Sequence, residues 1–311
     1  MEEREFAHRY PRLAGLLDRR WLTPGLLAGY VPQGLAWAGE GCLLVAAHCA
    51  RKERPSLIIT VDSVDGRPLE AARLRETDGS PHIGHVGGLA VIGHSIFVTS
   101  GRRSSPLGVG LQFPLSSIMS PGLDGVVAEA EMVIDARGSF MTAHDGDLWV
   151  GDFWRLRGNG HRTAAHHHHG QHRGWVAAHR VGAGGLASAP HRALFIPSCV
   201  QGITFVGEMI ILSRSWGSSD SGLELHKLPA RPWRQRCLPS GSPLDVAILD
   251  DHTLVEVLTM PPGAQGVAWT GSNVITVFEG GAIRYTDRWR SDGAIIEDCI
   301  LGLRLPDDHP P

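Results

Sequence analysis

Three charged residues, Asp152, Arg214 and Glu279, stand at equivalent points of a segment that recurs along the chain. Each lies two residues after the apolar residue that sets the strand register, and the other two copies have Ala47 and Ser100 there. Because strand side chains alternate with a period of two, all five positions share a face. Two carboxylates and a guanidinium in one pocket suit acid–base chemistry with an anchor for an anionic group. We therefore predict Asp152 and Glu279 as acid and base and Arg214 as a substrate-binding group. In the alternative, all three are strand ends that turn into solvent, and Arg214 forms a structural ion pair with a carboxylate.

Aromatic and imidazole side chains flank these positions. The flanking residues are His48, Phe153, Trp154, Trp216 and Phe278. Ligand pockets are mostly apolar, with a few converging polar groups. We predict Trp154, Trp216 and Phe278 as substrate-binding residues, and His48 as a catalytic imidazole.

Two more histidines, His82 and His85, lie in the glycine-rich stretch SPHIGHVG. An imidazole there could reach the same pocket as a base or a ligand. We predict His85 as catalytic, the alternative being a solvated loop histidine.

Glutamine precedes a glycine at three equivalent places: Gln33, Gln201 and Gln265. These amides would point toward the same pocket and position substrate oxygens. Alternatively, they join neighbouring repeats through backbone hydrogen bonds.

The repeated segment must position all of these groups. It contains two glycines five residues apart: Gly34 and Gly39, Gly88 and Gly93, Gly202 and Gly207, Gly266 and Gly271. A fifth copy, FMTAHDG, keeps Gly146 but has Met141 in place of the first glycine. A second apolar run follows each copy, and further strand-like runs and turns separate the copies, such as AIRYTDRW (residues 282–289) in the fifth unit.

Five such units of four antiparallel strands, with hardly any helical periodicity, are typical of an all-β, five-bladed β-propeller. A six-bladed ring, with an extra blade founded by residues 242–260, is the alternative. We expect one domain over residues 1–311. Residues 1–30 would form an N-terminal arm, partly helical, and Trp21–Tyr30 could close the ring. In a propeller, the starts of the inner strands and the ends of the second strands meet at one mouth of the central channel.

The repeated frame resembles the propellers of the gluconolactonase and strictosidine-synthase-like superfamily, in which a glycine-containing inner strand opens each blade. Metal-dependent members have Glu-Gly or Asn-Gly at particular blade openings, whereas this chain has Gln33-Gly34, Gln201-Gly202 and Gln265-Gly266. An uncharged glutamine is a poor ligand for a hard cation such as calcium. The resemblance therefore implies the architecture, and we assign no metal ligand, although a divalent cation in the channel remains compatible with the sequence.

Composition excludes several classes of function. The 29 Lys and Arg against 32 Asp and Glu give a net charge of −3, which argues against a nucleic-acid surface. No apolar run approaches the roughly 18 residues of a membrane helix. The acidic start MEEREF lacks the pattern of a signal peptide, and the five cysteines are scattered, as in a protein with reduced thiols. We expect a cytoplasmic protein that binds neither nucleic acid nor membrane.

The most conspicuous local feature is the His-rich loop, residues 156–174, which includes GHRTAAHHHHGQHR. Such tracts can bind transition metals, but this one has no acidic or cysteine partner within it. We expect a disordered loop.

Four common motifs are absent from the sequence: the GxSxG nucleophile elbow of serine hydrolases, the HExxH of zinc proteases, the phosphate-binding P-loop, and the GxGxxG of dinucleotide-binding folds. We therefore predict an enzyme that acts on a small molecule by acid–base chemistry at the channel mouth, without a redox cofactor. Lactone or ester hydrolysis and lyase or cyclase chemistry both fit. The alternative is a non-catalytic, lectin-like or scaffold propeller that binds a sugar or a protein. Such a module would repeat its ligand contacts, whereas the strand-end residues here differ from blade to blade.

Overall fold

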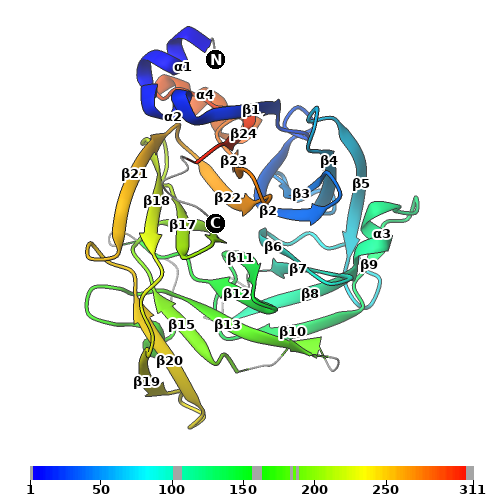
Figure 1. Ribbon diagram of the computed structural model, residues 1–311. Helices are drawn as coiled ribbons and strands as arrows, with labels where there is room; N and C mark the ends of the chain where they lie inside the picture. Colours follow the sequence, from blue (N-terminus) through cyan, green and yellow to red (C-terminus); the bar gives the residue numbers. More distant parts are fainter. Residues whose placement is uncertain (1–2, 101–106, 156–162, 183–184, 187–188, 306–311) are drawn as a thin grey trace.

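Five small β-sheets are arranged radially around a central channel (Figure 1). The computed structural model describes residues 3–100, 107–155, 163–182, 185–186 and 189–305. Successive inner strands contact one another around a closed ring. They are β2 (Tyr30–Gly39), β6 (Val86–Ile92), β11 (Phe140–His144), β16 (Val200–Val206) and β22 (Ala264–Trp269). The predicted five-bladed β-propeller is confirmed.

Each blade adds three antiparallel strands outward from its inner strand. The second strands are β3 (Cys42–Cys49), β7 (Ser95–Ser100), β12 (Asp147–Gly151), β17 (Met209–Arg214) and β23 (Val274–Phe278). The third strands are β4 (Leu57–Asp62), β8 (Gly108–Pro114), β13 (Trp175–Gly182), β18 (Ser221–Lys227) and β24 (Cys299–Leu303). The outer strands are β5 (Pro68–Arg75), β10 (Ala130–Ile134), β15 (Arg192–Phe195), β21 (Leu254–Met260) and β1 (Leu17–Leu22).

The first glycine of the frame lets neighbouring inner strands approach closely. A Cβ on Gly266 would lie 2.6 Å from the Leu35 nitrogen of the next blade, and one on Gly88 would lie 2.6 Å from the Met141 nitrogen. In four blades the register between inner and second strands also shifts near this glycine, as at a β-bulge. The blade with Met141 keeps an unbroken register. The second glycines have positive φ, as tight hairpin turns require.

Residues 242–260 do not found a sixth blade, so that alternative is wrong. β20 (Pro243–Ile248) pairs in parallel with β15 and, with β19 (Arg234–Cys237), extends the third sheet outward. β21 pairs with β18 and completes the fourth blade. Two-residue strands also border two blades: β9 (Val126–Val127) pairs with β5, and β14 (Gly185–Leu186) pairs with β13.

The N-terminal segment joins the two ends of the ring. Helices α1 (Glu3–Arg9) and α2 (Pro11–Leu16) precede β1, which pairs with β24 near the C-terminus (Figure 1). The strand therefore starts before the expected Trp21–Tyr30 segment. Phe6, Tyr10 and Leu13 are buried against the last two blades.

In the described part of the chain after the arm, two short α-helices and one 3-10 turn interrupt the β-structure. They are α3 (Leu115–Met119), the 3-10 turn η1 (Ala165–His167) and α4 (Ile283–Ser291). The segment of α4 reads as a strand in the sequence, but Tyr285 and Trp289, four residues apart, stack at 4.9 Å on one helical face. None of the described helices is long and apolar enough to cross a membrane.

Candidate functional site

A polar cavity of about 400 Å³ lies at the mouth where inner strands begin and second strands end. We call it the polar mouth. It brings together seven of the predicted catalytic and binding residues that are distant in sequence: Gln33, His48, His85, Gln201, Trp216, Gln265 and Glu279. Of these, the repeat predicts the convergence of Glu279 and the three glutamines, and the catalytic and binding roles stay predictions.

Glu279 is the central acidic group of this cavity. It follows β23, and the Gln33 amide donates a 3.0 Å hydrogen bond to its Oε2. Gln265 and Tyr285 also hydrogen-bond to the carboxyl group. Enclosure by the protein raises the pKa of Glu279 to about 7, against the opposing effects of these hydrogen bonds and of Arg284. Protonated and ionised forms are thus both populated at neutral pH.

Two imidazoles lie beside each other in the polar mouth. The rings of His48 and His85 are 4.6 Å apart. Burial, together with Arg284 and Lys52, lowers the pKa of His48 to about 4. His48 is therefore neutral at pH 7, and its Nδ1 is buried without a hydrogen-bond partner in the described part of the chain.

Cationic side chains surround these groups, and the sequence alone did not single them out. Lys52, Arg137 and Arg284 line the cavity, whereas Glu279 is its one carboxylate among the described lining residues. Arg284 and Tyr285 come from α4, the segment that reads as a strand. Arg137 lies in the loop before β11. Because such loops lie next to the starts of the inner strands, their place in the sequence is the signal that could have indicated Arg137 as a lining residue. The polar mouth is suited to an anion.

Asp152 lies behind the mouth rather than in it. Its side chain is fully buried, its Oδ1 accepts a 2.6 Å hydrogen bond from the backbone N–H of Arg137, and its Oδ2 lies 2.6 Å from His167 Nδ1. Asp152 therefore fixes the loop that carries Arg137 instead of facing the cavity.

Arg214 and Trp154 line a different cavity, of about 280 Å³. The Arg214 guanidinium pairs with Glu224 on the neighbouring strand β18, and its Nε donates to the Ser198 carbonyl. The expected meeting of Arg214 with Glu279 is therefore wrong, because a carboxylate of its own blade draws the side chain away. The alternative of a structural ion pair describes Arg214 better.

The remaining aromatic residues lie in different places, in the core or at the polar mouth. Phe278 is fully buried in the core, so its expected role as a wall of the site is wrong. It precedes Glu279, and neighbouring strand residues point to opposite faces. Trp216 and Phe153 do line the polar mouth, with ring centroids 5.9 Å apart, and Trp216 is 51% exposed. The histidine His82 does not line the polar mouth; it is buried and hydrogen-bonded to Glu76.

The expected disorder of the His-rich loop is wrong for its described part, residues 163–174; residues 156–162 lie outside the described chain. His166 and His167 belong to η1, and His167 is fully buried. Their acidic partners, Asp135 and Asp152, come from other parts of the sequence. That separation explains why the tract appeared to lack partners.

Comparisons with known proteins support the architecture. No protein-family model and no curated protein matches the chain. A GH43_1 enzyme from Xanthomonas citri is similar in structure, with a TM-score of 0.52 and 10% identity over 97% of this chain and 95% of that one. RS223-Beta-xylosidase gives a TM-score of 0.49 at 9% identity, over 94% of this chain and 98% of that one.

Other similar structures are longer than this protein. The chain spans 55% of the matched hydrazine synthase from Kuenenia stuttgartiensis, which covers 79% of this chain at 9% identity and a TM-score of 0.36. At 10% identity, the similarity to the GH43_1 enzyme shows the fold alone. The molecule is a five-bladed β-propeller with a polar, cationic mouth.

Proposed function

We propose that this protein is a hydrolase of small anionic molecules, with lactones or esters that carry a carboxylate as the preferred class. The observation that carries the proposal is the Glu279 carboxyl group, whose pKa of about 7 lies next to three cations and two imidazoles in one cavity. General acid–base groups work best with a pKa near the working pH.

Glu279 acts first as the general base and then as the general acid during hydrolysis. Its ionised form takes a proton from water while the water oxygen bonds to the substrate carbonyl carbon. The protonated form then returns a proton to the leaving oxygen as the carbon–oxygen bond breaks. One water is consumed. An ester gives a carboxylic acid and an alcohol, and a lactone gives a single hydroxy acid.

The other lining groups bind and orient the substrate. Arg284, Arg137 and Lys52 attract its carboxylate, and the amides of Gln201 and Gln265 donate to substrate oxygens. His48 is neutral and contributes a donor or an acceptor rather than charge. Trp216 and Phe153 provide an apolar wall.

Glycoside hydrolysis is the second candidate, because the GH43_1 enzyme shares this architecture over nearly the whole chain. That reaction requires two carboxyl groups on either side of the scissile bond. Glu279 has no carboxylate partner among the described residues that line the polar mouth, and Asp152 is fully buried. Lactone or ester hydrolysis therefore fits better, and lyase or cyclase chemistry could use the same acid–base group.

A non-catalytic sugar-binding role has one observation in its favour, the half-exposed Trp216 ring at the mouth. Such a role leaves the raised pKa of Glu279 without a purpose.

Five free cysteines fit a reducing compartment, so we place the enzyme in the cytoplasm.

The test is a panel of lactones, carboxylate esters, glycosides and neutral esters, followed by Glu279→Gln on the best substrate. This substitution keeps the size of the side chain and removes the ionisable group. We expect turnover to fall by about 10²–10⁴-fold. Asp145→Asn, the same chemical change at the other end of the channel, should leave turnover unchanged.

Activity of folded Glu279→Gln within twofold of the wild type would remove Glu279 from the mechanism. Saturable sugar binding without turnover of any compound in the panel would favour the lectin-like alternative.

A further inference from the structure

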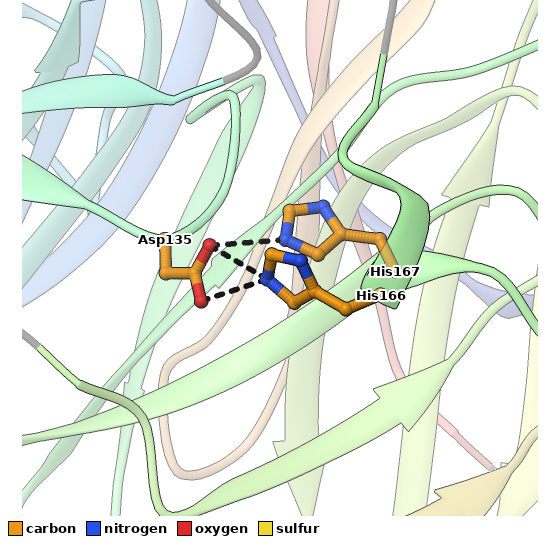
Figure 2. Close-up of side chains that lie close together, drawn as sticks. All are labelled: Asp135, His166 and His167. Carbon is orange, nitrogen blue, oxygen red and sulfur yellow. Dashed lines mark hydrogen bonds and ion pairs between the residues drawn. The ribbon is translucent and has the colours of Figure 1, made fainter. Parts of the chain in front are cut away.

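Asp135, His166 and His167 form a compact cluster outside the polar mouth (Figure 2). Asp135 directly follows β10, and the two histidines end the 3-10 turn η1. The figure shows both imidazoles facing the same carboxylate. We call this group the Asp–His cluster.

The distances in the cluster suit a shared cation. His166 Nε2 lies 3.0 Å from both carboxylate oxygens of Asp135, and His167 Nε2 lies 3.2 Å from its Oδ1. Ligand bonds of about 2.1 Å in a tetrahedral zinc site place neighbouring ligand atoms about 3.4 Å apart. The distance from each imidazole to the carboxylate is therefore within a few tenths of an ångström of this spacing, and all three ligand atoms lie within 4.8 Å of one another.

The buried Asp152 fixes the orientation of one imidazole. An ionised carboxylate only accepts hydrogen bonds, so His167 Nδ1, 2.6 Å away, must donate to it. In neutral His167 the Nε2 atom then carries a lone pair that faces Asp135. Two acceptors in contact repel each other unless a proton or a metal ion lies between them. A carboxylate behind a metal-binding histidine is a recurrent feature of such sites.

Aromatic packing holds the cluster in place before any ion arrives. Trp175 is fully buried, stacks on His167 at 4.1 Å and meets His166 edge-on at 5.2 Å. Its Nε1 also donates a 3.1 Å hydrogen bond to the Asp135 carbonyl. Side chains locked by packing lose little freedom when they bind a metal.

We propose that the Asp–His cluster binds one divalent transition-metal ion, of which Zn²⁺ is the best match. Two imidazoles with one carboxylate select zinc-like ions over calcium or magnesium, which prefer oxygen ligands. The side chains of His166 and Asp135 are 24% and 20% exposed, so water can reach a fourth coordination position.

The site would position the polar mouth rather than perform its chemistry. Asp152 joins the two regions, because one of its oxygens contacts His167 and the other holds the Arg137 backbone at the mouth. Metal binding itself does not depend on the proposed hydrolysis, so a failure of either proposal leaves the other standing.

The experiment measures metal binding directly on full-length protein after treatment with a chelator. Zn²⁺ is titrated by calorimetry, and Co²⁺ is followed by its visible absorption. We expect one ion per chain in the wild type. His166→Ala and Asp135→Asn should each weaken binding at least 100-fold, and Asp152→Asn should weaken it about 10–100-fold.

The matched control is the double variant His168→Ala, His169→Ala, which changes two other imidazoles of the same tract. His168 contacts Thr163, and His169 contacts Arg236, so this variant should bind as the wild type does. Circular dichroism checks that each variant is folded, and two independent ligand variants guard against the misfolding of one.

Absence of stoichiometric binding by the wild type would overturn the proposal. So would wild-type affinity in folded His166→Ala and Asp135→Asn, or loss of binding in the double control variant, which would assign the metal to His168 and His169.

Discussion

The two ends of the central channel differ in chemistry although the same five strands build both. At the polar mouth, the residues before the frame glycines are Gln33, Gln201 and Gln265. The opposite end is a cavity of about 330 Å³ in which the residues after those glycines, such as Leu35 and Ala268, take their place. A few residues along an inner strand thus separate a pocket lined by three cationic side chains from one whose described lining includes no lysine or arginine.

The connections explain why the two ends differ in their charged groups. At the opposite end, inner and second strands are joined by short hairpin turns, such as Gly207–Glu208 between β16 and β17. The polar mouth receives the loop of Arg137 and helix α4, which bring in Arg284 and Tyr285. Long connections positioned by a rigid scaffold commonly carry binding and catalytic groups.

The largest effect on stability is expected at the first glycines of the frames, which lie on the inner strands between the two ends of the channel. In Gly266→Ala the new Cβ would lie 2.6 Å from the Leu35 nitrogen and 2.7 Å from the Gln33 oxygen. We expect a loss of about 1–3 kcal/mol in the free energy of unfolding. Urea denaturation measures it.

Gly222→Ala, on the third strand of the fourth blade, is the matched control. Its Cβ meets only Val257 Cγ1 at 3.4 Å, so its stability should stay within about 0.5 kcal/mol of the wild type. Equal losses in both variants would contradict the role of Gly266 in close strand approach.

The charge of the polar mouth should set its preference for anions. Arg284→Gln removes one of the three lining cations, and we expect KM for an anionic substrate to rise about tenfold, which corresponds to about 1.4 kcal/mol. Arg290→Gln, in the last turn of the same helix and away from the cavity, should leave KM unchanged. Equal KM values in both variants would show that the mouth does not bind the substrate anion.

A smaller effect is expected in the pH dependence of stability. Glu279 binds its proton more tightly in the folded state, where its pKa is about 7, than at the ordinary value of 4.5. Its favourable contribution is full below pH 4.5 and is lost as the pH rises through 7. The melting temperature of the wild type relative to Glu279→Gln should therefore fall by a few degrees between pH 5 and pH 8. A constant difference would argue against the raised pKa.

The sequence predicts the architecture because the structure repeats. The glycine frames locate every inner strand, including the one with Met141, and the apolar runs locate the second strands. The outer strands are less regular, so the sequence leaves a sixth blade at residues 242–260 open, and the pairing of β20 with β15 excludes it.

Most of the predicted part of the polar mouth follows the repeat, whereas His85 comes from a glycine-rich loop. Glu279 and the glutamines reach the mouth through strand geometry alone. Arg137, Arg284 and Tyr285 belong to irregular connections whose path depends on tertiary packing. The partners of Arg214 and His167, namely Glu224 and Asp152, are set by strand pairing and by the long loop after β12, which a linear pattern does not encode.

The most direct test of a functional acid–base group at the polar mouth is the pH dependence of kcat/KM on the best substrate. We predict an ionisation near pH 7 in the wild type that is absent from the residual activity of Glu279→Gln. A wild-type profile that is flat through this range, or the same ionisation in the variant, would contradict the assignment.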